Sequence, residues 1–233
     1  MSSDYTLYYW PIPFRGHFIR HILAHVGARW DEADIDAVED LRATSPADQP
    51  YPFMAPPLLH DHRRDVWISQ MPAIALHLGR AHDLITDEAQ TMRLFCDASD
   101  VLFEITCHHG DRMWDEASWR TFTAHRLPRW MQLHEALASR TGVMRDRGFM
   151  FGADTPSLAD LALTTLWHTM TTHLPALRPM LEAHAPTVAG VTDRIAATPA
   201  IAALNTAWET REPRYCAGQI EASLIDMLAR YGA

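Results

Sequence analysis

The chain has 233 residues, 48% of them hydrophobic, which is enough for one large domain or two small ones around a substantial core. Its formal net charge of −9 argues against a nucleic-acid-binding protein, which usually presents a basic face. The longest apolar stretch, residues 158–177, contains Asp160, His168 and His173, so it is too polar to span a membrane and predicts a buried helix.

The cysteine content points to a reducing compartment. Cys96, Cys107 and Cys216 are odd in number, and none lies in a CxxC motif, so they do not form a disulfide framework. A signal peptide has a basic stretch followed by an apolar run. The first sixteen residues lack this pattern, so they do not form a signal peptide. We therefore expect a cytoplasmic protein.

The first eighty residues predict a small α/β unit. In chain order, we expect a strand, a helix ending at Gly27, a weak second strand, a polar connection with at most one short helix, a hairpin and a last helix with Ser69 as N-cap. These elements are expected over residues 5–10, 15–27, 30–36, 37–54, 57–69 and 69–80. A helix between the first two strands is typical of a βαβ crossover.

The rest of the chain predicts helices alone. Apolar residues recur at helical spacing in five long stretches, and no convincing strand separates them. These stretches are residues 87–114, 118–141, 157–174, 177–198 and 201–212. We therefore place the domain boundary between residues 1–83 and residues 84–233.

Two consecutive prolines, Pro56 and Pro57, stand directly before the predicted strand that begins with Leu58. Proline cannot donate to a sheet ladder, so it is confined to strand starts, edges and bulges. One interpretation is a cis bond at Pro56, which would turn the N–H and C=O of Ala55 outward to pair with an extended peptide. The other is a simple polyproline-type entry into the strand.

Four motifs, in this order and at suitable spacing, resemble the cytosolic glutathione transferases. They are YTLYYWPIPFRGHFIRHILAHVG, APPLL, ISQMPAIALHLGR and DTPSLADLAL, and the likeness extends over nearly the whole chain. The resemblance implies an α/β thioredoxin-like N-terminal domain that binds glutathione, followed by an all-α helical C-terminal domain with the site for a small hydrophobic electrophile. It also implies glutathione as co-substrate, a cytoplasmic homodimer, a role in detoxification, and no nucleic-acid or membrane partner.

The resemblance also assigns the glutathione-binding residues. The cysteine backbone of glutathione would pair with Ala55, ahead of Pro56, and the γ-glutamyl carboxylate would lie at the helix that opens with Gln70 and Met71. A helix N-terminus offers free N–H donors and a partial positive charge to such an anion. Family members usually carry Ser or Thr where this chain has Met71, so the main-chain donor remains but a hydroxyl is missing, which weakens binding.

The catalytic residue of this family is Tyr, Ser or Cys at the end of the first strand or the start of the first helix. Neither Ser nor Cys occurs between Trp10 and His17, and the stretch resembles tyrosine-type members when Tyr9 takes the catalytic place. Its hydroxyl would donate a hydrogen bond to the thiolate, which is the nucleophile. Arg15 would fix the loop or support the site electrostatically. The alternative for Tyr9 is an ordinary aromatic residue of the strand. The alternative for Arg15 is a solvated residue at the start of the helix.

Other features favour structural roles. Ser157 and Asp160 form an S-x-x-D capping box at the start of an apolar helix. The pairs His60–His62 and His108–His109 lack a nearby third ligand, so we expect no metal site. Asp97 and Asp100 are candidates to reach a partner subunit's glutathione, but ordinary surface charges are the simpler interpretation.

Two further points stay open at this stage. One interpretation of the C-terminal tail is that it folds back over the active site and brings Tyr215 or Cys216 near the substrate. The same thiolate could also serve isomerisation, peroxide reduction or dehalogenation. The alternative to an enzyme is a non-catalytic transferase-like protein that binds apolar ligands or a partner, and Met71 is the residue that favours it.

Overall fold

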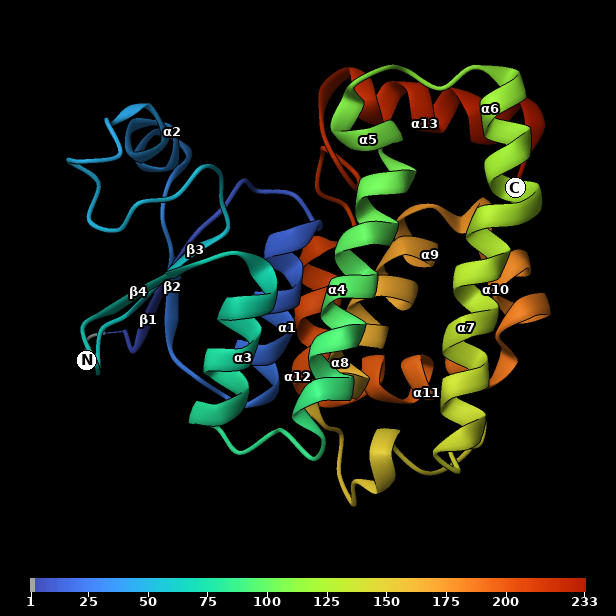
Figure 1. The fold of residues 1–233 in the computed structure, drawn as a ribbon, viewed down its shortest axis with the longest axis horizontal. Coiled ribbons are helices and arrows are strands. Elements are labelled where there is room, and N and C mark those ends of the chain that lie inside the picture. The colour runs from blue at the N-terminus through green and yellow to red at the C-terminus, as the bar shows by residue number, and fades with distance from the viewer. Residues whose placement is uncertain (1–2) are drawn as a thin grey trace.

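The computed structural model describes residues 3–233 and consists of a sheet-containing part and a helical part packed side by side (Figure 1). The sheet has the strand order β2-β1-β3-β4, in which β2 is parallel to β1 and the other pairs are antiparallel. Its strands are β1 (Tyr5–Tyr8), β2 (Trp30–Glu32), β3 (Leu58–Asp61) and β4 (Val66–Ser69). This is the α/β thioredoxin-like arrangement expected from the sequence.

Three helices accompany the sheet: α1 (Arg15–His25), α2 (Ile35–Ala43) and α3 (Met71–Ala81). The first strand alternates between its two faces, because Tyr5, Leu7 and Tyr9 are buried while the residues between them are half-buried. The buried side chains join the apolar faces of α1 and α3 in one core. The helix α1 ends just before Gly27, whose φ of +63° is the left-handed conformation that suits a residue after a helix.

The helical part follows from residue 88 to residue 231. Its α-helices are α4 (Glu88–Ile105), α5 (Cys107–Gly110), α6 (Glu116–Thr121), α7 (Leu127–Arg140), α8 (Leu158–Leu163), α9 (Thr169–His173), α10 (Arg178–His184), α11 (Pro186–Ala196), α12 (Pro199–Trp208) and α13 (Gly218–Tyr231). Two π-helical turns, Phe122–Arg126 and Thr164–His168, and two 3-10 turns, Met150–Gly152 and Pro175–Leu177, complete it. The all-α second part is therefore confirmed.

The π-helical turns join shorter helices into two long ones. Residues 116–140 form one continuous helix, in which the N–H of Leu127 bonds to the carbonyl of Phe122. Pro128 follows directly and lacks the N–H that an α-helical bond to residue 124 needs. A π turn is a common way to shift the hydrogen-bond register inside a helix.

Three sequence predictions need correction in the helical regions. The helix expected over residues 87–114 stops at Ile105, because the three residues from Cys107 onward have positive φ. The helix expected over residues 177–198 breaks at Ala185, before Pro186. Ser69 belongs to β4, so Gln70 is the N-cap of α3. The tail contains a long helix, α13, which the sequence reading left without a structure.

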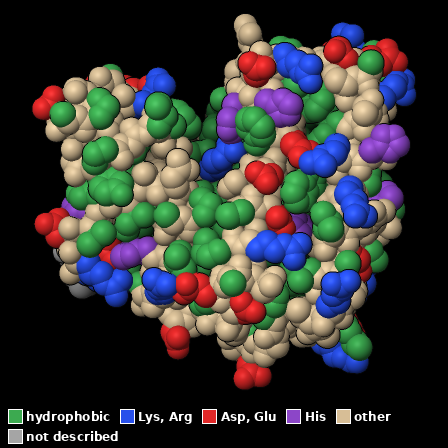
Figure 2. Space-filling model, viewed as in Figure 1, with side chains coloured by type: hydrophobic (Ala, Val, Ile, Leu, Met, Phe, Trp, Pro, Cys, Tyr) green, Lys and Arg blue, Asp and Glu red, His purple; other side chains and the backbone are tan. Residues whose placement is uncertain are grey.

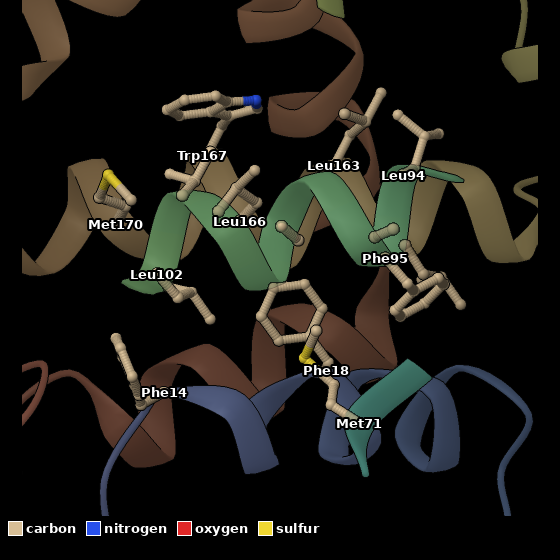
Figure 3. Close-up of a cluster of buried hydrophobic side chains, with 14 of the residues drawn as sticks. Phe14, Phe18, Met71, Leu94, Phe95, Leu102, Leu163, Leu166, Trp167 and Met170 are labelled. Atoms are coloured by element: carbon tan, nitrogen blue, oxygen red, sulfur yellow. The ribbon is translucent and has the colours of Figure 1, made fainter. Parts of the chain in front are cut away.

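The two parts share a continuous hydrophobic core, in which α1 and α3 pack against α4 and α8 (Figure 3). Phe18 and Phe95 meet there with ring centroids 6.0 Å apart. A Cβ at Gly79 of α3 would lie 2.5 Å from Cδ2 of Leu158, so α3 and the start of α8 are closely packed at this glycine.

The capping box predicted at Ser157 is present at the start of α8. The Asp160 carboxylate accepts hydrogen bonds from the Ser157 N–H at 2.9 Å and from the Met150 N–H at 2.9 Å. Both donors and the carboxylate are buried, so this aspartate joins the helix start to the preceding 3-10 turn. Its role is structural, as expected.

Candidate functional site

A cavity of about 640 Å³ lies between the two parts of the molecule, where Figure 2 shows a deep hollow at the top. This volume is typical of a small-molecule site. The residues from the sheet-containing part are Tyr9, Trp10, Pro11, Ile12, Phe14, Arg15, Ile35, Ala55, Pro56, Pro57 and Gln70. Those from the helical part are Thr106, His109, Pro213, Cys216, Ala217 and Ile220. No Asp or Glu occurs among these described lining residues, so the cavity wall is uncharged or positive.

Tyr9 follows the last residue of β1 and is only 3% exposed. Its ring lies directly on Gly16, where a Cβ would be 2.2 Å from Cδ1 of the tyrosine. Burial raises the pKa of Tyr9 to about 12, although the charges of Arg15 and Arg20 and the main-chain N–H groups at the start of α1 act in the opposite direction. At neutral pH the hydroxyl is therefore protonated and can donate a hydrogen bond.

Arg20 supports the loop that carries this wall of the cavity. Its fully buried guanidinium donates to the carbonyl of Ile12 at 2.8 Å and to that of Trp10 at 3.1 Å, and it pairs with Glu32 at 2.7 Å. It also lies over the ring of Trp208 in α12, 4.1 Å from the centroid. The sequence analysis missed this residue, although a charge on the apolar face of a predicted helix is a signal that could have revealed it.

Arg15 opens α1 and lines the cavity beside Tyr9. Its guanidinium donates to the carbonyl of Ser99 at 3.3 Å and lies 5.1 Å from the ring centroid of Phe14. Burial lowers its pKa, while the hydroxyls of Tyr9 and Tyr215 act against this change. Arginine nevertheless stays charged in proteins, and no carboxylate pairs with Arg15 among residues 3–233. An unpaired, partly buried cation of this kind favours an anion in the cavity.

The prolines before β3 line the cavity, but the predicted cis bond is wrong by one residue. The cis peptide joins Pro56 to Pro57, so Pro57 rather than Pro56 is in cis. The ladder begins at Leu58, opposite Tyr8, and Pro57 is the residue that stands immediately outside it. Two adjacent X–Pro bonds cannot be distinguished from their residue types alone. Ala55 also lines the cavity, and it has the main-chain N–H that both prolines lack.

The side chains of Gln70 and Met71 have different surroundings at the start of α3. Gln70 lines the cavity with a φ of +72°, and its side chain does not cap its own helix. The Met71 side chain is 1% exposed and points into the core (Figure 3), so it does not line the cavity. Because Pro72 is the second residue of the helix and has no N–H, the free main-chain donors of the first turn belong to Met71 and Ala73.

The helical wall of the cavity contains residues that sequence reasoning did not assign. Thr106 and His109 belong to a turn in which Cys107, His108 and His109 all have positive φ, a conformation that is rare outside glycine and clusters at functional sites. Burial, together with the neighbouring Arg15 and His108, lowers the pKa of His109. Its imidazole is therefore neutral at physiological pH.

The C-terminal tail does fold back to the cavity. Cys216 lines it, while Tyr215 is buried behind it with its ring against Phe14, at 5.5 Å between centroids. Burial raises the pKa of Cys216 to about 12, so its thiol is protonated at neutral pH. The cysteine is therefore an apolar wall residue rather than a nucleophile.

The remaining candidates lie elsewhere. Asp97 is mostly buried beside Arg93 and His134, with 3.4 Å between the side-chain nitrogen and the carboxylate oxygen in each pair, and Asp100 is at the surface. His60 stacks on Trp67 at 4.1 Å between ring centroids. Over residues 3–233, no group of three or more His, Cys, Asp or Glu side chains is placed to hold a metal ion. In the same range, none of the helices combines the length and apolar character needed to cross a bilayer.

Comparison with known proteins decides the family. Residues 90–227, more than half of the chain, match the family described as glutathione S-transferase, C-terminal domain. The chain belongs to the glutathione S-transferase family. A search of curated proteins finds no matching sequence for this chain.

Several solved structures share the fold of this chain. The Pi-class glutathione S-transferase of Onchocerca volvulus is 20% identical over 88% of this chain and 93% of its own, with a TM-score of 0.66. Rat hPGDS complexed with a quinoline is 19% identical over 87% and 96%, with a TM-score of 0.67. Ure2p in complex with glutathione is 20% identical over 86% and 98%, with a TM-score of 0.65. At these identities the likeness establishes the fold, which agrees with the thioredoxin-like and helical arrangement.

Proposed function

We propose that the protein is a glutathione transferase of the tyrosine type, in which Tyr9 stabilises the thiolate of glutathione. The observation that carries the proposal is the arrangement of Tyr9 and Arg15 in one cavity wall. A protonated hydroxyl and an unpaired guanidinium face a space that no described carboxylate lines. This combination favours an anion such as a thiolate over the neutral thiol.

The size of the effect follows from the hydrogen bond. A free thiol has a pKa of about 8.5, and a hydrogen bond to a charged group contributes roughly 1.5–3 kcal/mol, which lowers the thiol pKa by one to two units. The Arg15 charge and the first turn of α1 act in the same direction. The thiolate sulfur then attacks an electrophilic carbon, forming the S–C bond, while the electron pair of the broken bond leaves with the displaced group or moves onto the acceptor.

Glutathione would lie along the wall formed by the sheet-containing part. We propose that its cysteine backbone pairs with Ala55 and rests against Pro56, and that its γ-glutamyl end meets Gln70 and the main-chain N–H of Met71. The exposed amide of Gln70 supports this assignment because it does not cap its own helix. The missing hydroxyl at Met71 predicts weaker binding than a Ser or Thr would give.

The second substrate is a small hydrophobic electrophile bound against the helical wall, where Pro213, Ala217 and Ile220 present apolar side chains to the cavity. In this proposal residues 1–83 bind glutathione and residues 84–233 supply the electrophile site. We also propose a homodimeric, cytoplasmic enzyme with a role in detoxification.

The test is a calorimetric titration with glutathione, followed by a screen of apolar electrophiles. We expect saturable binding of one glutathione per subunit and turnover that Tyr9→Phe abolishes. Tyr8→Phe is the matched control, because Tyr8 lies on the other face of β1, with its ring tilted against that of Trp67 at 5.4 Å between centroids, and does not line the cavity. Equal turnover in Tyr9→Phe and the wild type would refute the tyrosine assignment.

The second candidate is a non-catalytic protein that binds glutathione or apolar ligands. Met71 favours it, because a buried methionine stands where a hydroxyl would help to hold the γ-glutamyl carboxylate. This candidate predicts that the cavity takes up apolar ligands with no conjugation of any electrophile in the screen. Saturable glutathione binding without turnover would support it over the enzyme.

A further inference from the structure

The segment between α12 and α13, residues 209–217, forms much of the helical wall without regular structure of its own. Pro213, Cys216 and Ala217 of this segment line the cavity, together with Ile220 of α13. A stretch without regular hydrogen bonds needs another source of order if it is to hold a defined wall. The source is a single carboxylate.

Glu221, in the first turn of α13, accepts hydrogen bonds from the main-chain N–H groups of three successive residues. The distances are 3.0 Å to Arg214, 2.6 Å to Tyr215 and 2.9 Å to Cys216. The side chain is 8% exposed, and no ion pair engages it among residues 3–233. Charge-assisted hydrogen bonds of this kind are about twice as strong as neutral ones, so the carboxylate holds the segment firmly to α13.

The same segment is also fastened on its other side. The Tyr215 ring meets the edge of Phe14 at right angles, 5.5 Å between centroids, and Phe14 belongs to the loop that carries the Tyr9 wall. At the far end, Gly110 approaches Ile220 so closely that a Cβ would lie 2.6 Å from its Cγ1. Glu221 thus connects α13 to a wall that touches both parts of the molecule, although it does not line the cavity itself.

We propose that Glu221 is a positioning residue that determines the width of the electrophile site, and hence which apolar electrophiles the cavity accepts. The proposal rests on the proposed transferase function and adds a residue to it. Without the carboxylate, the three N–H groups have no common acceptor and the segment 213–217 can move away from Phe14. The wall from Tyr9 to Gln70 has no hydrogen bond to Glu221, so glutathione binding does not depend on it.

The experiment compares Glu221→Gln and Glu221→Ala with the wild type. Glutamine keeps the shape of the side chain but loses the negative charge and one of the two acceptor oxygens. Alanine loses the charge and both acceptor oxygens. Glu209→Gln is the matched control, because Glu209 lies on the same segment, is exposed and does not line the cavity. For each variant, we would measure kcat and KM for the electrophile, the Kd for glutathione, the Kd for an anilinonaphthalene sulfonate dye and the melting temperature.

We expect KM for the electrophile to rise about tenfold in Glu221→Ala and less in Glu221→Gln, with kcat changed by less than about twofold, since lost uniform binding affects KM alone. The Kd for the dye should rise in the same order, while the Kd for glutathione and all values of Glu209→Gln stay at the wild-type level. Unchanged KM and dye affinity in Glu221→Ala would overturn the proposal. A parallel loss of glutathione affinity would do the same, because it would indicate a merely structural residue.

The dye separates this proposal from the proposed function. If the wild type conjugates no electrophile, the transferase proposal fails, yet the dye still reports on the width of the cavity. Weaker dye binding by Glu221→Ala then supports the role of Glu221 in shaping the wall, and unchanged dye binding refutes it. Because Glu221→Gln preserves the volume of the side chain, it provides the comparison if the alanine variant does not fold.

Discussion

Substitution of Gly16 by alanine tests the placement of Tyr9 most sharply without touching Tyr9 itself. An added Cβ would lie 2.2 Å from Cδ1 and 2.4 Å from Cγ of the tyrosine ring, whereas ordinary contacts of a Cβ begin at 3.4 Å. The ring must therefore move by about 1 Å, since the helix backbone on the other side is fixed by its own hydrogen bonds. A displacement of about 1 Å at a reacting group can cost about 100-fold in rate.

The effect on stability is smaller and of mixed sign. Alanine in place of glycine favours a helix by roughly 0.5–1 kcal/mol, while overpacking costs typically 1–3 kcal/mol. We therefore expect Gly16→Ala to lower the unfolding free energy by about 1 kcal/mol and kcat/KM by about 100-fold, with glutathione still bound.

The assay is the initial rate of conjugation, measured beside calorimetric binding and urea unfolding. The control is Gly27→Ala, because Gly27 has a φ of +63° but no atom within 4 Å of its added Cβ. It should lose about 1 kcal/mol of stability through backbone strain and keep full activity. Wild-type activity in Gly16→Ala would refute the placement of Tyr9 as the thiolate donor.

Three other predictions follow from burial and hydrogen bonding. Alkylation at neutral pH should modify the exposed Cys96 fast and the buried Cys107 and Cys216 slowly, which mass spectrometry of the labelled peptides would check. Asp160→Ala should lower the unfolding free energy by about 3 kcal/mol in urea, because two buried N–H donors lose their acceptor; a loss below about 0.5 kcal/mol would contradict this account. Burial raises the pKa of Tyr9 from 10.0 to about 12, so its neutral form is favoured by folding. That contribution to stability is complete below pH 10 and is lost as the pH rises toward 12. Between those values, the free energy of unfolding of the wild type should fall by roughly 2–3 kcal/mol more than that of Tyr9→Phe. Equal losses in the two proteins would argue against a buried hydroxyl.

Strong local patterns explain what the sequence could predict. The alternation of Tyr5, Leu7 and Tyr9, the Gly27 helix end and the box at Ser157 each depend on residues close together in the chain, so their structures follow from short-range rules. The order of elements was predictable for the same reason, whereas the expectation that Tyr9 belongs to the site came from the resemblance to the family.

Contacts between distant segments explain what the sequence could not predict. The charge of Arg20 on an apolar helix face is visible in the sequence, but its distant partner Trp208 is not. The hydrogen bonds from residues 214–216 to Glu221 are local, but residues 209–217 have no regular structure, so no periodic pattern predicts them. The choice between Pro56 and Pro57 depends on where the ladder with β1 begins, which is a property of the folded sheet. The positive φ values from Cys107 onward end α4 early, although the residue types favour no such turn.

The central claim is that Tyr9 lowers the pKa of the glutathione thiol, and the pH dependence of thiolate absorbance in the binary complex tests it directly. In the wild type we expect the bound thiol to titrate one to two units below its free value of about 8.5, and in Tyr9→Phe to titrate close to that value. The same depressed thiol pKa in both proteins, with glutathione bound equally well, would contradict the account.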